Sequence, residues 1–232
     1  MPDEQSSKLD EIDVLAGLDP EDRQQIAKNC GWYTYSAHEQ IIDRQNDTTD
    51  VYFIVKGTVR VVNYSLSGRE ITLDDLGPGN SFGELAAIDS QPRSASVMAL
   101  TDCLLASYPQ QQFLDLLKAK GTVAIRVMEL MARIIRTSTA RIMDLSTLAA
   151  NNRVQAELLR QANKNGIVDN ASLIKPIPIH SDIASRVSTT RETVTRVLGD
   201  LTKNGLIERQ PNGLKILNVE RLQDMVEEVR GE

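Results

Sequence analysis

Glu84 and Arg93 are two charged side chains whose setting in the sequence suits the binding of a small anionic molecule. Both lie in residues 82–97, FGELAAIDSQPRSASV. Gly83 allows a ligand to approach the backbone, and a helical turn beginning at Glu84 offers N–H groups at its start. Arg93 is followed by small residues, so its guanidinium can hold a phosphate in a bidentate fashion, and Ser94 adds a hydroxyl donor. With Glu84 accepting from sugar hydroxyls, the segment predicts a nucleotide site; the alternative is a surface arginine paired with Glu84 on a turn.

A second group of polar side chains lies near the C-terminus, in residues 187–198, VSTTRETVTRVL. The 3.6-residue period of apolar positions predicts a helix over residues 191–201. A shorter helix is expected over residues 179–187, and residues 188–190 form the turn between the two. Two short helices joined by a small turn are the geometry of a helix-turn-helix. The outward face of the second helix carries polar and charged side chains: Arg191, Glu192, Thr195 and Arg196.

The order Phe-Gly-Glu-Leu-Ala followed by Pro-Arg-Ser-Ala-Ser-Val resembles the phosphate-binding cassette of cyclic-nucleotide-binding domains. The C-terminal segment resembles the recognition element of the Crp–Fnr transcription regulators, and the two resemblances cover nearly the whole chain from about Leu15. The resemblance implies that Ser138 and Thr139, on a long central helix, contact the base of the nucleotide, sometimes across a dimer. The ligand-binding residues implied in this way are Gly83, Glu84, Leu85, Arg93, Ser94, Ser138 and Thr139.

For the helix-turn-helix, the match is closest to the catabolite-activator (cyclic AMP receptor protein) branch. That branch implies a palindromic DNA site with TGTGA-like half-sites, and RNA polymerase as a further partner. Arginine suits the paired acceptors of guanine, so Arg191 and Arg196 are expected to read guanines, with Glu192 on a cytosine. Thr195 stands where the branch often has glycine, which leaves the flanking preference open. The expected phosphate contacts are Ser188, Thr190 and Lys215.

Composition limits the possible classes of protein. The chain has 232 residues, 41% of them hydrophobic, which suits two modest domains with real cores. No apolar run approaches the roughly 20 residues of a membrane span. The acidic, polar N-terminus is unlike a signal peptide, and two distant cysteines, Cys30 and Cys103, fit a reducing cytoplasm. Two cysteines also argue against an iron–sulfur sensor, which needs about four thiolates. No metal site is expected.

Charge alone argues weakly against a nucleic-acid binder, because the net charge is −6. The uneven distribution of charge along the chain weakens this argument against nucleic-acid binding. Residues 1–150 carry 14 basic and 21 acidic side chains, whereas residues 151–232 carry 12 basic and 11 acidic ones. Basic side chains can therefore gather on one face of the second part.

The pattern along the chain predicts an α+β protein with four parts. Short alternating runs between Trp32 and Tyr108, separated by turn residues, predict an antiparallel β-sandwich or roll, preceded by one or two short helices over residues 15–29. Two C-terminal runs flanking Pro-Asn-Gly predict the β-hairpin wing of a winged helix-turn-helix. The expected parts are a disordered N-terminus (1–12), a cyclic-nucleotide-binding β-roll (13–121), a long dimerisation helix (122–150) and a winged helix-turn-helix domain (151–232).

Helical periods return after Pro109. A helix is expected over residues 110–119, and another from Thr122 to about Ala149, with Asn151 and Asn152 marking a junction. The long helix carries two apolar rows, and two rows favour a dimer over one helix lying on its own domain. Val127, Leu130 and Ile134 form the row expected on the β-roll. The row expected to meet a second copy is Met128, Met131, Ile135, Ile142 and Leu145, interrupted by Ser138.

These features predict a homodimeric transcription regulator in which a cyclic nucleotide in the β-roll changes the geometry of the long helix and so the DNA-binding state. cAMP is favoured over cGMP because Ser138 and Thr139 offer partners for the adenine amine, although Ser94 could bond a guanine. Nothing resembles a catalytic constellation, and His38 and His180 are expected to be surface or loop residues. The alternatives are a regulator with another effector, such as haem, a signalling subunit that recruits a protein, and a nucleotide hydrolase.

Overall fold

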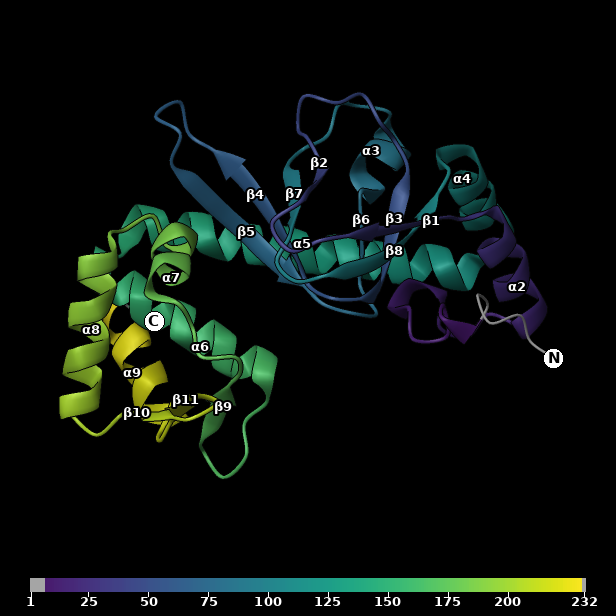
Figure 1. The fold of residues 1–232 in the computed structure, drawn as a ribbon. Coiled ribbons are helices and arrows are strands. Elements are labelled where there is room, and N and C mark those ends of the chain that lie inside the picture. The colour runs from purple at the N-terminus through teal and green to yellow at the C-terminus, as the bar shows by residue number, and fades with distance from the viewer. Residues whose placement is uncertain (1–6, 231–232) are drawn as a thin grey trace. The chain divides into compact units, whose positions relative to one another are not determined.

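The computed structural model describes residues 7–230, and residues 1–6 and 231–232 lie outside the described part (Figure 1). The chain divides into two compact units, Met1–Ile134 and Ile135–Glu232. The division falls within the long helix α5 (Gly121–Thr147), inside the range expected for the linking helix. The fold is α+β, with antiparallel sheets in both units.

The first unit is built on a β-roll, whose described strands form two four-stranded antiparallel sheets. One sheet has the order β1-β8-β3-β6 and the other the order β2-β7-β4-β5. Alternating sequence runs predicted most of these strands, but not β6, because two residues are too few to show a period. The strands are β1 (Gly31–Tyr35), β2 (Gln40–Ile42), β3 (Val51–Lys56), β4 (Val59–Tyr64), β5 (Glu70–Leu76), β6 (Ser81–Phe82), β7 (Ser96–Ala99) and β8 (Cys103–Tyr108).

Helices and an N-terminal segment cover the roll. The 3-10 helix η1 (Asp13–Leu15) and α2 (Pro20–Asn29) precede β1, and α3 (Glu84–Asp89) lies between β6 and β7. Residues 1–12 were expected to be disordered, but Leu9 and Ile12 are buried in the core that contains Phe53 and Phe113. The expectation is therefore wrong for residues 7–12, because two apolar side chains in a polar segment suffice to hold it on the core.

Two helices follow the roll, α4 (Gln110–Ala119) and α5, close to the expected ranges. On the first half of α5, Val127 is buried and Leu130 packs against the core of the roll, as expected. The burial of two side chains of α5 differs from the sequence prediction. Met131, assigned to the free row, is partly buried against this same core, and Ile134, assigned to the packed row, is 40% exposed.

The junction after α5 lies earlier than expected. Helix α6 begins at Ala150 (Ala150–Asn165), so Asn151 and Asn152 belong to its first turn rather than to the break. The break is at Ala149, whose backbone is extended (φ −64°, ψ 157°). Leu148 beside it is buried against Ala156 and Val226, and this packing turns the chain where no breaking residue occurs in the sequence.

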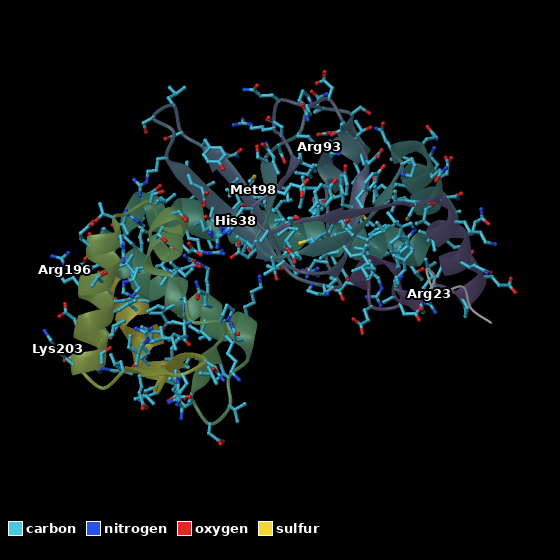
Figure 2. All side chains as sticks on the ribbon, in the orientation of Figure 1. Arg23, His38, Arg93, Met98, Arg196 and Lys203 are labelled. Carbon is cyan, nitrogen blue, oxygen red and sulfur yellow. The ribbon has the colours of Figure 1, made fainter. Side chains whose placement is uncertain are left out.

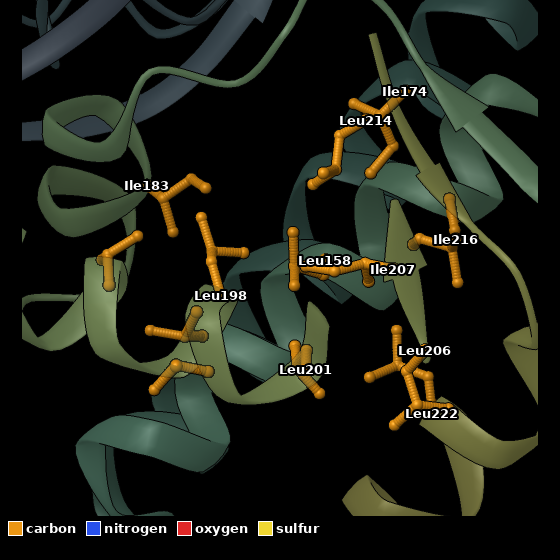
Figure 3. Close-up of a cluster of buried hydrophobic side chains, with 14 of the residues drawn as sticks. Leu158, Ile174, Ile183, Leu198, Leu201, Leu206, Ile207, Leu214, Ile216 and Leu222 are labelled. Atoms are coloured by element: carbon orange, nitrogen blue, oxygen red, sulfur yellow. The ribbon is translucent and has the colours of Figure 1, made fainter. Parts of the chain in front are cut away.

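The second unit combines the last part of α5 with four later described helices and a three-stranded sheet of the order β10-β11-β9. Its described elements after α6 are β9 (Ser172–Ile174), α7 (His180–Arg186), α8 (Arg191–Lys203), β10 (Ile207–Gln210), β11 (Gly213–Ile216) and α9 (Val219–Arg230). Figure 3 shows the aliphatic side chains of these elements converging on Leu158 and Leu201. Helices α7 and α8 with the β10–β11 hairpin form the winged helix-turn-helix that the sequence predicted.

Candidate nucleotide site and nucleic-acid interface

Arg93 lies buried at the start of the segment leading into β7, with 4% of its surface exposed (Figure 2). Its Nε donates to the Thr48 hydroxyl at 3.1 Å, and its Nη1 donates to the Gly83 carbonyl at 3.1 Å. Its Nη2 donates to the Asp50 carbonyl at 2.9 Å. This burial excludes the alternative of a surface arginine on a turn. The guanidinium is instead a fixed, buried cation.

Glu84 begins α3 and is also buried, with 6% of its surface exposed. Burial raises the pKa of its carboxyl group, an effect opposed by its own backbone N–H and by Arg93. Burial likewise lowers the pKa of the Arg93 guanidinium, while Tyr52, Asp50 and Glu84 act in the opposite direction. The structure thus brings together the two charged residues that the sequence selected. Such charges are costly to bury and gain from a ligand that bonds both.

Gly83 directly precedes Glu84, accepts from Arg93 through its carbonyl and needs to be glycine for two reasons. Its φ of +90° is in the left-handed region, which strains any residue with a Cβ atom. A Cβ atom there would also lie 2.7 Å from Arg93 Nη1 and 2.8 Å from the Asp50 carbonyl oxygen. Because Gly83 has no Cβ atom, the Arg93 guanidinium can lie against the backbone at this position.

Three residues around Arg93 were not selected from the sequence: Thr48, Asp50 and Tyr52. The Tyr52 ring lies 5.9 Å from the Arg93 guanidinium and stacks on Phe82 at 5.1 Å between ring centroids. Thr48 and Asp50 lie in the loop before β3, and Asp50 contributes a backbone carbonyl. A carbonyl is present in every residue type, so nothing in the sequence marks this role.

The other predicted ligand residues are placed differently. Leu85 is half-buried in α3, and the Ser94 side chain is exposed, with its carbonyl accepting from Asn63 at 3.3 Å. Ser138 and Thr139 are exposed on α5, in the second unit. The structure therefore brings together Gly83, Glu84 and Arg93, and the roles of Ser138 and Thr139 stay predictions.

In the second unit, α7 and α8 are joined by a tight turn at Ser188, whose φ is +51°. The Thr190 hydroxyl accepts from the Thr193 N–H at 3.3 Å and caps α8. Arg153 on α6 holds this turn by donating to the carbonyls of Val187 at 2.9 Å and Ser188 at 3.2 Å. Nothing in the sequence marks Arg153 for this role, because its acceptors are again backbone carbonyls.

The exposed face of α8 carries the four predicted base-reading side chains. Arg191, Glu192, Thr195 and Arg196 are exposed and line one open hollow on the surface. Figure 2 shows Arg196 and Lys203 on the outer side of α8. Lys203 follows Arg196 by two helical turns and was not selected, because one lysine at a helix end has many ordinary explanations.

Electrostatics keep Glu192 ionised. Its own backbone N–H, the Thr190 hydroxyl and Arg191 all lower the pKa of its carboxyl group.

The three residues predicted to contact phosphates differ in exposure. Ser188 is half-buried and Thr190 is exposed. Lys215 is half-buried on β11, opposite Glu208 of β10 and Leu173 of β9. The predicted phosphate contacts therefore lie at the turn, the start of α8 and the wing.

No group of three or more His, Cys, Asp or Glu side chains among residues 7–230 could hold a metal ion. Burial raises the pKa of the Cys30 thiol to about 12, which makes it a poor nucleophile. In the same part of the chain, no helix is long and apolar enough to cross a membrane.

Both units match known families. Residues 33–120 match the model of the cyclic nucleotide-binding domain, and residues 152–225 match that of the Crp-like helix-turn-helix domain. Each match lies within one of the two domains expected from the sequence.

Curated relatives and solved structures agree with these matches. The chain is 31% identical over 177 residues to the cyclic AMP receptor protein of Thermus thermophilus, covering 75% of this chain and 78% of that protein. It is 26% identical over 210 residues to the cAMP-activated global transcriptional regulator CRP of Haemophilus influenzae, covering 87% and 94%. A solved structure of a CooA mutant from Carboxydothermus hydrogenoformans has the same fold, with a TM-score of 0.76 at 21% identity, covering 86% and 88%.

Proposed function

Because the chain belongs to the Crp family of cyclic-nucleotide-binding transcription regulators, we propose that it is a homodimer that binds a palindromic promoter site when cAMP occupies the β-roll. The family is one of DNA-binding regulators and not of enzymes. The effector, the dimer and the form of the DNA site go beyond membership of this family.

The single observation that carries the effector assignment is the buried guanidinium of Arg93 beside the buried carboxyl group of Glu84. Nε of Arg93 uses its one N–H on Thr48, whereas Nη1 and Nη2 each carry a second N–H that the three described bonds do not use. A cyclic phosphate can accept from these two N–H groups, and ribose hydroxyls can donate to Glu84. Such a ligand joins an anion and a sugar within one ring.

The base of the nucleotide distinguishes cAMP from cGMP. Gly83, Leu85 and Ser94 belong to the proposed site as its backbone and rim. Ser138 and Thr139 offer hydroxyl partners for the adenine amine, which favours cAMP. Two relatives support the same choice, because one is named a cyclic AMP receptor protein and the other a cAMP-activated regulator. A cGMP-gated regulator is the alternative, with Ser94 bonding the guanine.

On the DNA side, Arg191 and Arg196 read guanines and Glu192 reads a cytosine within TGTGA-like half-sites. Thr195 reads the neighbouring position. The phosphate contacts are Ser188, Thr190 and Lys215, and the protein acts in the cytoplasm with RNA polymerase as a partner.

The dimer forms through the exposed apolar side chains of α5. Met128, Ile135 and Ile142 are spaced by seven residues and are 55%, 62% and 62% exposed, and Leu145 is 48% exposed. A seven-residue apolar repeat on a long helix is the pattern of a coiled-coil seam. Met131 completes the proposed seam, although it is partly buried against the core of the roll.

Calorimetric titration with cAMP and cGMP tests the effector. We expect Arg93→Gln to lose binding by at least about 100-fold, since it removes a buried charge-assisted bidentate contact. Lys28→Gln, which removes one exposed positive charge from the same unit, should leave binding unchanged. Equal weakening by both variants, or undiminished binding by Arg93→Gln, would contradict the site.

Selection of DNA from a random pool by the full-length protein tests the reader. Arg196→Ala should lose the selected sequence, whereas Arg221→Ala, an exposed arginine on α9, should retain it. Recovery of no sequence by the wild-type protein with any nucleotide would overturn the assignment of α8.

A further inference from the structure

His180 lies at the first position of α7 and bonds a residue on the exposed face of α8. Its Nδ1 is 2.8 Å from the Thr195 hydroxyl oxygen. That hydroxyl also lies 2.9 Å from the carbonyl of Arg191, one turn earlier in α8, in the geometry of a donor to it. One hydroxyl is thus engaged by two partners within the protein.

The hydrogen-bonding capacity of Thr195 follows from these two contacts. A hydroxyl carries a single proton. If the Thr195 hydroxyl donates to the Arg191 carbonyl, His180 donates from Nδ1 to the hydroxyl oxygen. If the hydroxyl instead donates to His180 Nδ1, the Arg191 carbonyl receives no hydrogen bond from Thr195. In both arrangements the proton is used inside the protein. Thr195 can donate to a base only by breaking one of these bonds, so the groups that it still presents are a hydroxyl lone pair and its methyl group, and the methyl group is the one that neither bond involves.

The surroundings keep His180 neutral near physiological pH. Burial, followed by the positive charges of Arg191 on α8 and Arg209 on β10, lowers the pKa of its imidazole. The contact with Thr195 therefore persists as a bond between two neutral groups, and the imidazole adds no charge to the α8 surface.

We propose that Thr195 is a specificity-determining residue that recognises a thymine through contact of its methyl group with the thymine 5-methyl, and that His180 is the positioning residue that fixes this orientation. The thymine 5-methyl is the apolar group on the major-groove edges of the base pairs, and the methyl group of a threonine can make an apolar contact with it. Thr195 lines the same surface hollow as Arg191 and Arg196, so its thymine lies beside the base pairs that they read. The inference rests on the proposed role of α8 as the DNA reader.

Replacement of thymine by deoxyuridine in the selected site removes this methyl group and nothing else from the DNA. Each thymine of the half-site is replaced in turn, in both half-sites, and affinity is measured by fluorescence anisotropy with the full-length protein and the nucleotide that tightens binding. We expect one position at which the wild-type protein binds the uracil site more weakly, by about fourfold per half-site, as expected for one buried methyl group.

Variants of Thr195 separate the methyl group from the hydroxyl group. Thr195→Val loses the hydroxyl and its bond to His180 but carries a methyl group at both γ positions, so it presents a methyl group to the thymine without that bond and should retain the thymine-to-uracil ratio. Thr195→Ser keeps the hydroxyl and loses the methyl, so its ratio should fall to one. A serine variant with the wild-type ratio, or a valine variant with none, would overturn the proposal.

Variants of His180 test its positioning role through the same ratio, which a change in stability or in general affinity would not alter. His180→Ala should reduce the ratio, and His180→Asn, whose amide can replace Nδ1, should restore it. Ser181→Ala, at the next exposed position, is the control. An unchanged ratio in His180→Ala would remove the histidine from the proposal.

Two kinds of failure are distinguishable. If the wild-type protein selects no DNA sequence, the proposed function fails, and this inference fails with it. If it binds a selected site but no thymine is sensitive to uracil, only the inference is overturned.

Discussion

Arg93 and Glu84 are ionisable side chains that the first unit buries at a stability cost. Three hydrogen bonds fix the guanidinium, and burial raises the pKa of the carboxyl group. A ligand that accepts from the first and donates to the second offsets the cost of both. Two consequences can be measured at single residues.

The first consequence is a pH dependence of nucleotide binding. In the proposed site, ribose hydroxyls donate to the ionised form of Glu84, so nucleotide binding should release the proton of this carboxyl group at any pH where the free protein holds it. Because the folded-state pKa of Glu84 is raised, the window lies above the ordinary glutamate value of 4.5. Affinity should rise with pH through this window, by at most about tenfold per pH unit, and then level off. Calorimetry in buffers of different ionisation enthalpy measures the released proton.

Glu84→Gln is the control for this dependence, because an amide does not titrate. Its binding should be weak and without a pH slope in the same window. A wild-type affinity that is constant across the window would contradict the role of Glu84 as acceptor of the sugar hydroxyls.

The second consequence concerns Gly83. Gly83→Ala should lower the free energy of unfolding by about 1–2 kcal/mol, because its φ of +90° is strained for alanine. It should also weaken nucleotide binding, because the new Cβ atom displaces Arg93. Gly77→Ala is the matched control, since no atom lies within 4 Å of its Cβ position. Urea denaturation and calorimetry would reveal the two effects, and equal behaviour of both variants would refute the account of Gly83.

For single residues, the sequence predicted those of the candidate site that lie within one segment, and it missed those that contact Arg93 from distant parts of the chain. Glu84 and Arg93 stand nine positions apart with a glycine beside them. Thr48 and Asp50 bond Arg93 from 45 and 43 residues earlier in the chain. Asp50 acts through a backbone carbonyl, which no residue type signals.

Helix α5 ends in a buried ion-pair network that ties it to other helices of the second unit. Asp144 is 2% exposed and accepts from Arg160 of α6 at 2.5 Å and from Arg230 of α9 at 2.6 Å. Glu157 of α6, also 2% exposed, accepts from Arg160 at 3.0 Å. The network holds the last turns of α5 on the unit that carries the DNA reader.

Loss of one buried carboxylate should leave the arginines without their partner. We expect Asp144→Asn to lower the free energy of unfolding by about 3 kcal/mol, at the low end for a broken buried pair because both arginines keep contact with water. Asp224→Asn, on the exposed face of α9, should change it by less than about 0.5 kcal/mol. Urea denaturation measures both, and a loss below about 1 kcal/mol for Asp144→Asn would contradict the structural role of the network.

Helices and strands were predicted where the period of apolar residues extends over enough positions to be recognised. The longer strands of the roll and helices α4, α5 and α8 follow from alternation and from the 3.6-residue period. Two features could not be predicted in this way. Strand β6 has two residues, and the break at Ala149 comes from the burial of Leu148 against Ala156 and Val226 rather than from a breaking residue.

The whole molecule is two units joined within α5, and the exposed surface of this helix bears on assembly. We expect Ile135→Asp with Ile142→Asp to convert the proposed dimer into a folded monomer, because both side chains are 62% exposed and do not contribute to a core. Sedimentation measures the mass, and affinity for a full palindrome should fall to that for a half-site. Val229→Asp, an exposed apolar position on α9, is the control. A double variant that stays dimeric would place the interface elsewhere.

Coupling between nucleotide and DNA is the central claim, and one measurement tests it most directly. Fluorescence anisotropy of a labelled TGTGA-type palindrome is recorded without ligand, with cAMP and with cGMP, for the wild-type protein and Arg93→Gln. We predict that cAMP tightens specific binding by about 5–150-fold, the range of typical allosteric couplings, and that Arg93→Gln abolishes the effect. Specific binding that neither nucleotide changes would contradict the account, and tightening by cGMP alone would reassign the effector.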